Sequence, residues 1–124
     1  MKIKTSELIG PALDWAVCNA AGMFEVYPKI GVGKTFLRLH TGNSAKYIHP
    51  STEWAQGGPI VEREKITLAY LKVEGVIRWE ARYFDDAGRF RSCEYGPTPL
   101  IAAMRCYVAY KIGGEVDVPE ELLT

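Results

Sequence analysis

The chain has 124 residues, of which 48% are hydrophobic and 24% are charged, so it has the composition of one globular domain rather than of a disordered segment. Its 15 basic and 15 acidic side chains cancel, which argues against non-specific nucleic-acid binding, because such binding needs an excess of Lys and Arg. Four arginines, Arg78, Arg82, Arg89 and Arg91, are nevertheless close enough in the sequence to form a local basic patch.

Residues 1–7 lack the apolar core of a signal peptide, and no apolar run approaches the roughly 18 residues of a membrane-spanning helix. We therefore expect a protein without membrane contact, located in the cytoplasm. The three cysteines, Cys18, Cys93 and Cys106, are odd in number and lack metal-ligand spacing. This pattern predicts reduced, buried thiols.

The first predicted elements are a short edge strand over residues 1–4 and a helix over residues 10–21. Pro11 suits the first turn of a helix, and Gly22 can adopt the left-handed conformation that ends one. Two β-prone runs at 24–27 and 35–39 predict a hairpin, with residues 28–33 as its turn. Residues 41–59 are rich in Gly, Asn, Ser and Pro, so we expect a long loop, after which Pro59 begins a helical turn.

The second half of the sequence predicts strands and then a helix. Residues 66–71 favour a strand, and apolar and charged side chains alternate over residues 76–84, which is typical of a strand with one wet face. A turn at 85–88 leads to a partner strand at 89–95. Thr98 as N-cap and Pro99 as first helical residue then predict a helix to residue 112, with only Arg105 and Lys111 charged between residues 100 and 112. A helix this apolar is buried on more than one side, by its own domain or by a second chain.

This order of elements predicts an α+β fold in a single domain over residues 1–124. We expect one antiparallel sheet of about four to six strands, with the two main helices packed on one face of it.

Motifs for catalysis or metal binding are weak. Residues 31–35, Gly-Val-Gly-Lys-Thr, resemble the end of a phosphate-binding loop, but a strand rather than a helix follows them. His40 and His49 lack metal-ligand spacing, and Ser51 and Ser92 lack a nucleophile-elbow context. We therefore predict no catalytic residue, no metal and no cofactor.

The run from Pro50 to Pro59 is the most informative segment, because a polar loop does not usually need a tryptophan. Trp54 either plugs the loop onto the core or forms one wall of a binding site. Its neighbours offer hydrogen-bond donors and acceptors, and glycine amides can bind an anion. The predicted ligand-binding residues of this segment are Ser51, Thr52, Trp54, Gln56, Gly57 and Gly58.

Three blocks of the sequence resemble the NinX-type proteins of lambdoid phages and prophages. They are MKIKTSEL through LDWAV at residues 1–17, PSTEWAQGGPIVERE at 50–64 and GPTPLIAAMRCYV at 96–108. The resemblance implies a phage or prophage origin and an accessory role near replication and recombination functions, but it implies no activity. It also extends over Asp14, Trp15 and Arg105, which we add to the predicted ligand-binding residues.

These observations favour a non-catalytic binding module that uses loop 50–59. Its ligand would be a small planar or anionic molecule, such as a nucleotide, or a short segment of a host protein. The alternative is a homodimeric interaction factor that modulates a host or phage protein of DNA metabolism, with the apolar C-terminal helix at its interface. A small enzyme of unrecognised type is the third choice.

Overall fold

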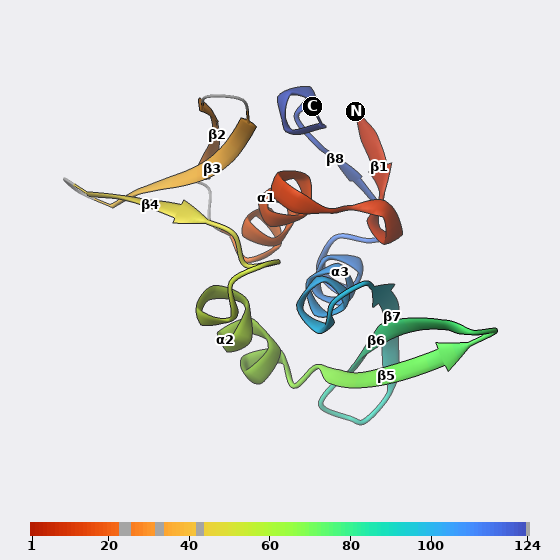
Figure 1. The fold of residues 1–124 in the computed structure, drawn as a ribbon. Helices are drawn as coiled ribbons and strands as arrows, with labels where there is room; N and C mark the ends of the chain where they lie inside the picture. The colour runs from red at the N-terminus through yellow and green to blue at the C-terminus, as the bar shows by residue number, and fades with distance from the viewer. Residues whose placement is uncertain (23–25, 32–33, 42–43, 124) are drawn as a thin grey trace.

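The computed structural model describes residues 1–22, 26–31, 34–41 and 44–123, and it describes side chains for 1–22 and 47–123. Helix α3 (Pro99–Lys111) lies at its centre (Figure 1). The sheet β5–β6–β7 packs on α3, and helices α1 (Gly10–Ala20) and α2 (Trp54–Glu64) contact it as well. The protein is therefore α+β, as predicted.

Helix α3 begins as predicted, since the Thr98 hydroxyl caps it by accepting a hydrogen bond from the Ile101 amide at 3.1 Å. Pro99 occupies its first turn. The prediction that this helix is largely removed from solvent is confirmed. Its buried residues lie on all sides of the helix and are Leu100, Ile101, Ala102, Ala103, Met104, Cys106, Tyr107 and Val108. The rest of the same chain covers this apolar surface, so a second chain is not needed to explain it.

Helix α1 also matches its prediction closely. Pro11 lies in its first turn, and Gly22, just beyond its end, has φ +76°. That positive φ is the left-handed conformation that ends many helices and that glycine adopts without strain. Leu13, Ala16 and Val17 of this helix are buried in the core.

The strands of the described residues form three antiparallel sheets rather than the single sheet that we predicted. One contains β2 (Val26–Gly31), β3 (Lys34–Thr41) and β4 (Ser44–Ile48); a second contains β5 (Thr67–Val73), β6 (Val76–Phe84) and β7 (Phe90–Gly96). In each of these two sheets, the hydrogen-bonded strands are consecutive in the chain, and no described strand of one sheet pairs with a strand of the other. The expectation that both helices lie on one face of a sheet is also wrong. Because α3 is apolar all round, it packs on the second sheet and α1 packs on α3.

The predicted strand at 76–84 has the same bounds in the structure, and the strands at 66–71 and 89–95 are shifted by one or two residues. The predicted first hairpin is present, but Pro28 belongs to β2 rather than to the turn. Residues 24, 25, 32 and 33 of that prediction lie outside the described residues.

The prediction of a long loop over residues 41–59 is wrong. Strand β4 occupies 44–48, and α2 begins at Trp54, five residues before Pro59. Two glycines and a proline inside one helix oppose its formation, which is why the sequence favoured a loop. Packing overrides this local preference, because Gly57 lies against Pro50 and Leu100, where a side chain would not fit.

The two ends of the chain lie side by side (Figure 1). Strand β1 (Lys2–Lys4) pairs with β8 (Glu115–Asp117), with Ile3 opposite Val116. The turn Thr5–Glu7 follows β1, and the turn Glu120–Leu123 follows β8. The apolar residues Val118 and Leu122 of this C-terminal segment are buried in the core.

Candidate functional site

The turn between β4 and α2 is held by hydrogen bonds from two predicted site residues. On α1, the Asp14 carboxylate accepts a hydrogen bond from the Ser51 amide at 2.8 Å. On α2, the Gln56 side chain accepts from the His49 amide at 2.7 Å and donates to the Tyr47 carbonyl at 3.0 Å. Asp14 and Gln56 therefore fix the backbone of residues 47–51. The side-chain polar groups of Asp14 and Gln56 make these bonds within the protein.

Asp14 is a buried carboxyl group with a strongly shifted pKa. Burial raises its pKa to about 6, because it removes water from the charged form. Hydrogen bonding by Ser51 and the charge of His49 act in the opposite direction but do not cancel the effect of burial. Asp14 therefore titrates in mildly acidic solution rather than near pH 4.

Ser51 is buried as well, and its side chain is in an unusual position. Within the described part of the chain, its hydroxyl is the one buried side-chain polar atom without a hydrogen-bond partner. The hydroxyl lies near enough to Asp14 to affect its pKa, yet the well-formed bond to the carboxylate comes from the Ser51 amide. An unpaired buried polar group costs about 1–3 kcal/mol. A protonated Asp14 is a donor that this hydroxyl could accept from.

The two glycines of α2 differ in their surroundings. A Cβ on Gly57 would lie against the Pro50 carbonyl oxygen and 2.7 Å from Leu100 Cδ1, so this position brings α2 close to the turn and to α3. A Cβ on Gly58 would meet only Trp54 Cε3, at an ordinary distance of 3.6 Å. Gly57 therefore has a packing role, whereas Gly58 lies beside the indole.

An apolar hollow of about 210 Å³ lies between α1 and α2. Residues of α1, of the β4–α2 connection and of α2 line it, and most of them are small or apolar: Val17, Cys18, Ala21, Ile48, Pro50, Ala55, Gln56 and Ile60. Asp14 lies one turn before Val17 and Cys18 on the same face of α1, because residues three and four apart share a helix face. We name this feature the α1–α2 hollow.

Trp54 lies on a different side of α2 from this hollow. Its side chain is 52% exposed, so it is not a plug in the core. With about 3.6 residues per turn, Trp54 and Gly58 share one side of the helix, while Gln56 and Ile60 project from the opposite side. The structure therefore separates the predicted indole wall from the hollow that Gln56 lines.

The remaining predicted residues lie in three different places. Thr52 is exposed, and its hydroxyl donates to the His49 carbonyl at 3.4 Å. Trp15 is partly buried and packs against the core. Arg105 donates to the carbonyls of Leu8 at 2.8 Å and Tyr95 at 2.9 Å, and so ties α3 to two other segments. It lines a separate hollow of about 430 Å³ beside β6 and β7.

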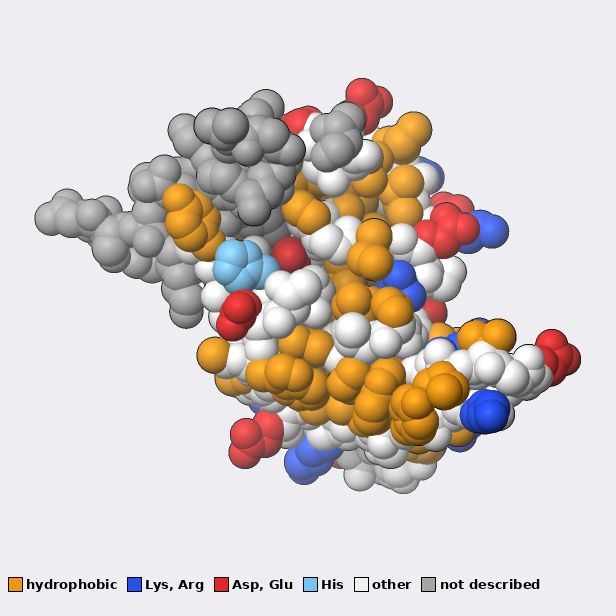
Figure 2. Space-filling view, viewed as in Figure 1, with side chains coloured by type: hydrophobic (Ala, Val, Ile, Leu, Met, Phe, Trp, Pro, Cys, Tyr) orange, Lys and Arg blue, Asp and Glu red, His pale blue; other side chains and the backbone are white. Residues whose placement is uncertain are grey.

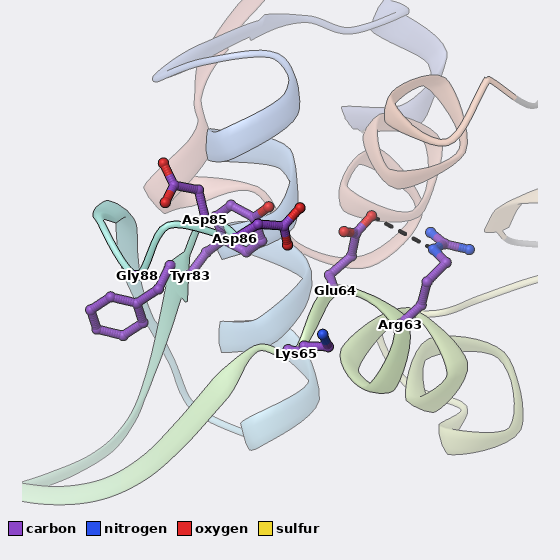
Figure 3. A pocket seen from close by; sticks show the side chains of 8 residues that line it. Arg63, Glu64, Lys65, Tyr83, Asp85, Asp86 and Gly88 are labelled. Carbon is purple, nitrogen blue, oxygen red and sulfur yellow. Dashed lines mark ion pairs between the residues drawn. The ribbon is translucent and has the colours of Figure 1, made fainter.

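A further hollow of about 280 Å³ is lined by charged side chains from the end of α2 and from the β6–β7 turn (Figure 3). Glu64 pairs with Arg63 at 3.6 Å, and Asp85 and Asp86 lie opposite them. None of the predicted ligand-binding residues lines it.

All three cysteines are free, as predicted, but only two of them are buried, because Cys93 is partly exposed. Cys18 and Cys106 are buried, and burial raises the pKa of Cys18 to about 12 and that of Cys106 to about 11. Both thiols therefore stay protonated near neutral pH and are poor nucleophiles. Within the described residues, no group of three His, Cys, Asp or Glu side chains could hold a metal ion.

Sequence reasoning missed most of the α1–α2 hollow, including Cys18, Ile48, Ala55 and Ile60. A signal for one wall was present, since Val17, Cys18 and Ala21 share a helix face with the polar Asp14. The wall formed by α2 could not be predicted from the sequence, because it depends on α2 beginning at Trp54 rather than at Pro59.

The fold and the hollow define a small α+β protein with an apolar surface cavity beside a buried carboxyl group. The family model described as "Bacteriophage P22, NinX" matches residues 4–111, so the chain belongs to this family, as its resemblance indicated. No curated protein matches the chain. No helix in the described ranges is long and apolar enough to span a membrane.

Proposed function

We propose that this protein is a non-catalytic binding module that captures a short segment of a host protein by enclosing one apolar side chain in the α1–α2 hollow. The observation that carries this proposal is the lining of the hollow, in which small and apolar residues from α1, the β4–α2 connection and α2 converge. Ligand sites typically have such an apolar lining. The Gln56 side chain is part of this wall and is itself fixed by its hydrogen bonds to His49 and Tyr47.

The size of the hollow favours a side chain over a nucleotide. Cavities of about 150 Å³ hold a single benzene ring, whereas sites for larger ligands measure about 300–1,000 Å³. At about 210 Å³ the hollow fits one aromatic or large aliphatic side chain. Among the described residues that line it, none carries a charge that could bind a phosphate.

A selection of phage-displayed random dodecapeptides on the folded protein tests this proposal. We expect the selected peptides to share one aromatic or large aliphatic residue. Ala55→Phe, which places a ring at the wall of the hollow, should weaken their binding by at least about tenfold while the protein stays folded, since a large interface anchor is worth about 2 kcal/mol or more. Peptides without a common apolar residue, or full binding by the Ala55→Phe variant, would contradict it.

Adenosine monophosphate serves as the probe for the small planar and anionic class of ligand. We expect no saturable binding at millimolar concentration in calorimetry. Saturable binding that Trp54→Ala abolishes and Ala55→Phe leaves unchanged would instead support a nucleotide site at the indole.

A homodimeric interaction factor acting on a DNA-metabolism protein is the second candidate, and the β5–β6 hairpin favours it. Four of its apolar side chains are exposed, at Tyr70, Val73, Val76 and Ile77. Hydrophobic side chains also gather over the α2 and β5 region of the surface (Figure 2). Exposed apolar patches often mark interfaces. Light scattering distinguishes the two candidates, because a monomer has the chain mass of 13.8 kDa and a two-fold dimer has twice that mass.

A further inference from the structure

The outer face of the β5–β6–β7 sheet carries exposed arginines. On β6, Arg78 and Arg82 alternate with Glu80, so all three project from one face, while Ala81 and Tyr83 face the core on the other. Register places Tyr95 opposite Glu80 and Cys93 opposite Arg82 on the same outer face. Arg91 lies two residues before Cys93, where the β6–β7 register is irregular, and its ion pair with Asp85 places it beside Arg89. We name this feature the arginine face: Arg78, Arg82 and Arg91, with Arg89 just before the start of β7.

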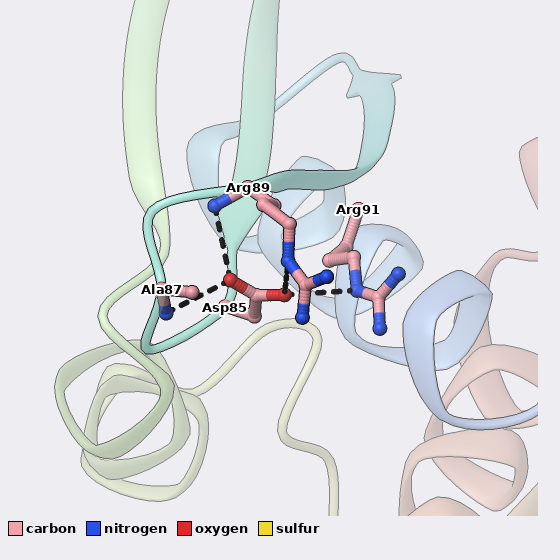
Figure 4. A network of polar contacts seen from close by, with 4 residues as sticks. All are labelled: Asp85, Ala87, Arg89 and Arg91. Carbon is pink, nitrogen blue, oxygen red and sulfur yellow. Dashed lines mark hydrogen bonds and ion pairs between the residues drawn. The ribbon is translucent and has the colours of Figure 1, made fainter.

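The carboxylates paired with these arginines are hidden, whereas the guanidinium groups are not. Arg82 binds Glu80 at 2.6 Å, and its side chain is 48% exposed against 8% for Glu80. Arg89 and Arg91 both bind Asp85, at 3.0 and 3.3 Å, and they are 71% and 50% exposed against 15% for Asp85 (Figure 4). Four arginines against these two carboxylates leave a net charge of +2, and the exposed groups are the cationic ones.

Arg78 is held differently, because an aromatic ring supports it. Its guanidinium carbon lies 4.2 Å from the centre of the Tyr95 ring. A guanidinium stacked in this way is oriented by the ring and presents a flat, polar surface. Nucleic-acid bases stack on arginine planes and on aromatic rings in single-stranded complexes.

We propose that the arginine face binds single-stranded nucleic acid, with its backbone along the arginines and a base against the Arg78–Tyr95 stack. The balanced charge of the whole chain does not oppose this binding, because the fold exposes arginines on this face and hides their carboxylates. Among anionic partners, single-stranded nucleic acid also uses the arginine stacked on an aromatic ring, which an acidic peptide does not need. The arginine face is separate from the α1–α2 hollow, so the two proposals can fail independently.

The test measures binding of a fluorescently labelled dodecathymidylate by anisotropy at several salt concentrations. If about three phosphates are neutralised, the logarithm of affinity should fall with the logarithm of salt concentration with a slope of about −2. The variant Arg78→Gln with Arg91→Gln removes two charges from the face, and it leaves the Arg82–Glu80 and Arg89–Asp85 ion pairs in place. The control, Lys4→Gln on β1 with Lys111→Gln on α3, removes two charges outside the β5–β6–β7 sheet.

We expect the arginine variant to lose at least about tenfold in affinity at 50 mM salt and its salt slope to flatten, while the lysine control stays within about twofold of the wild type. Thermal melting of both variants checks that they are folded. The proposal is overturned if the oligonucleotide does not bind, or if both variants bind it equally. It is also overturned if polyglutamate of equal charge displaces the oligonucleotide as well as unlabelled dodecathymidylate does, which would identify an acidic protein as the partner.

Discussion

At the scale of single residues, the structure gives several predicted site residues a positioning role. Asp14 and Gln56 use hydrogen bonds to hold the β4–α2 turn, and Arg105 holds two backbone carbonyls. The sequence singled out Gln56 as a hydrogen-bonding residue in a turn-rich segment, and the family resemblance added Asp14 and Arg105. It could not predict their partners, since Asp14 and Ser51 are 37 positions apart in the chain.

The first prediction concerns the pH dependence of stability through Asp14. Because burial raises its pKa from 3.8 to about 6, the folded state holds this proton more tightly than the unfolded state does. The stabilisation is therefore complete below about pH 4 and is lost as the pH rises through about 6, by roughly 3 kcal/mol in total. In urea denaturation, wild type minus Asp14→Asn should show this loss between pH 4 and 7. A pH-independent difference would contradict the shifted pKa.

The second prediction compares the two glycines of α2. Gly57→Ala should destabilise the protein by about 2 kcal/mol or more, because the new methyl group overlaps Pro50 and Leu100 in a packed region. Gly58→Ala has room beside Trp54 and should be neutral or stabilising by up to about 1 kcal/mol, since alanine favours a helix more than glycine does. Thermal melting of both variants measures the contrast. Equal effects would mean that α2 does not approach the turn as closely as described.

At the scale of elements, the sequence predicted the pieces with strong local signals. The N-cap and proline of α3, the proline and glycine around α1, and the alternation along β6 each agree with the structure. Helix α2 was missed because its glycines and proline oppose a helix locally, and the contact of Gly57 with Leu100 is not visible in the sequence. The division into three sheets was missed for a similar reason, since strand order depends on contacts between distant segments.

The third prediction tests the burial of α3. Met104 is fully buried in the core, so Met104→Asp places a charge without a designed partner in an apolar environment. We expect a loss of about 4 kcal/mol or more in the free energy of unfolding, or failure to fold. Met104→Leu conserves most of the volume and should cost less than about 1.5 kcal/mol. Near-wild-type stability of the aspartate variant would show that this face of α3 is open to water.

At the scale of the whole molecule, the predicted site residues are distributed over α1, the β4–α2 connection, two sides of α2 and a separate part of α3. The family and the α+β class of the fold could be predicted from the sequence. The α1–α2 hollow could not, because it forms where α1, the β4–α2 connection and α2 meet. It is the feature on which the proposed binding function depends, whereas the exposed Trp54 lies on the other side of the same helix.

The most direct test of this function is a ¹H–¹⁵N correlation spectrum of the labelled protein during titration with a selected peptide. Binding in the α1–α2 hollow should shift the amide signals of Ala21, Ala55 and Ile60, which line it. The indole N–H signal of Trp54 is the internal control and should stay in place, because that side chain is not part of the lining. A peptide that shifts the Trp54 indole and leaves the three amides unchanged would contradict the account.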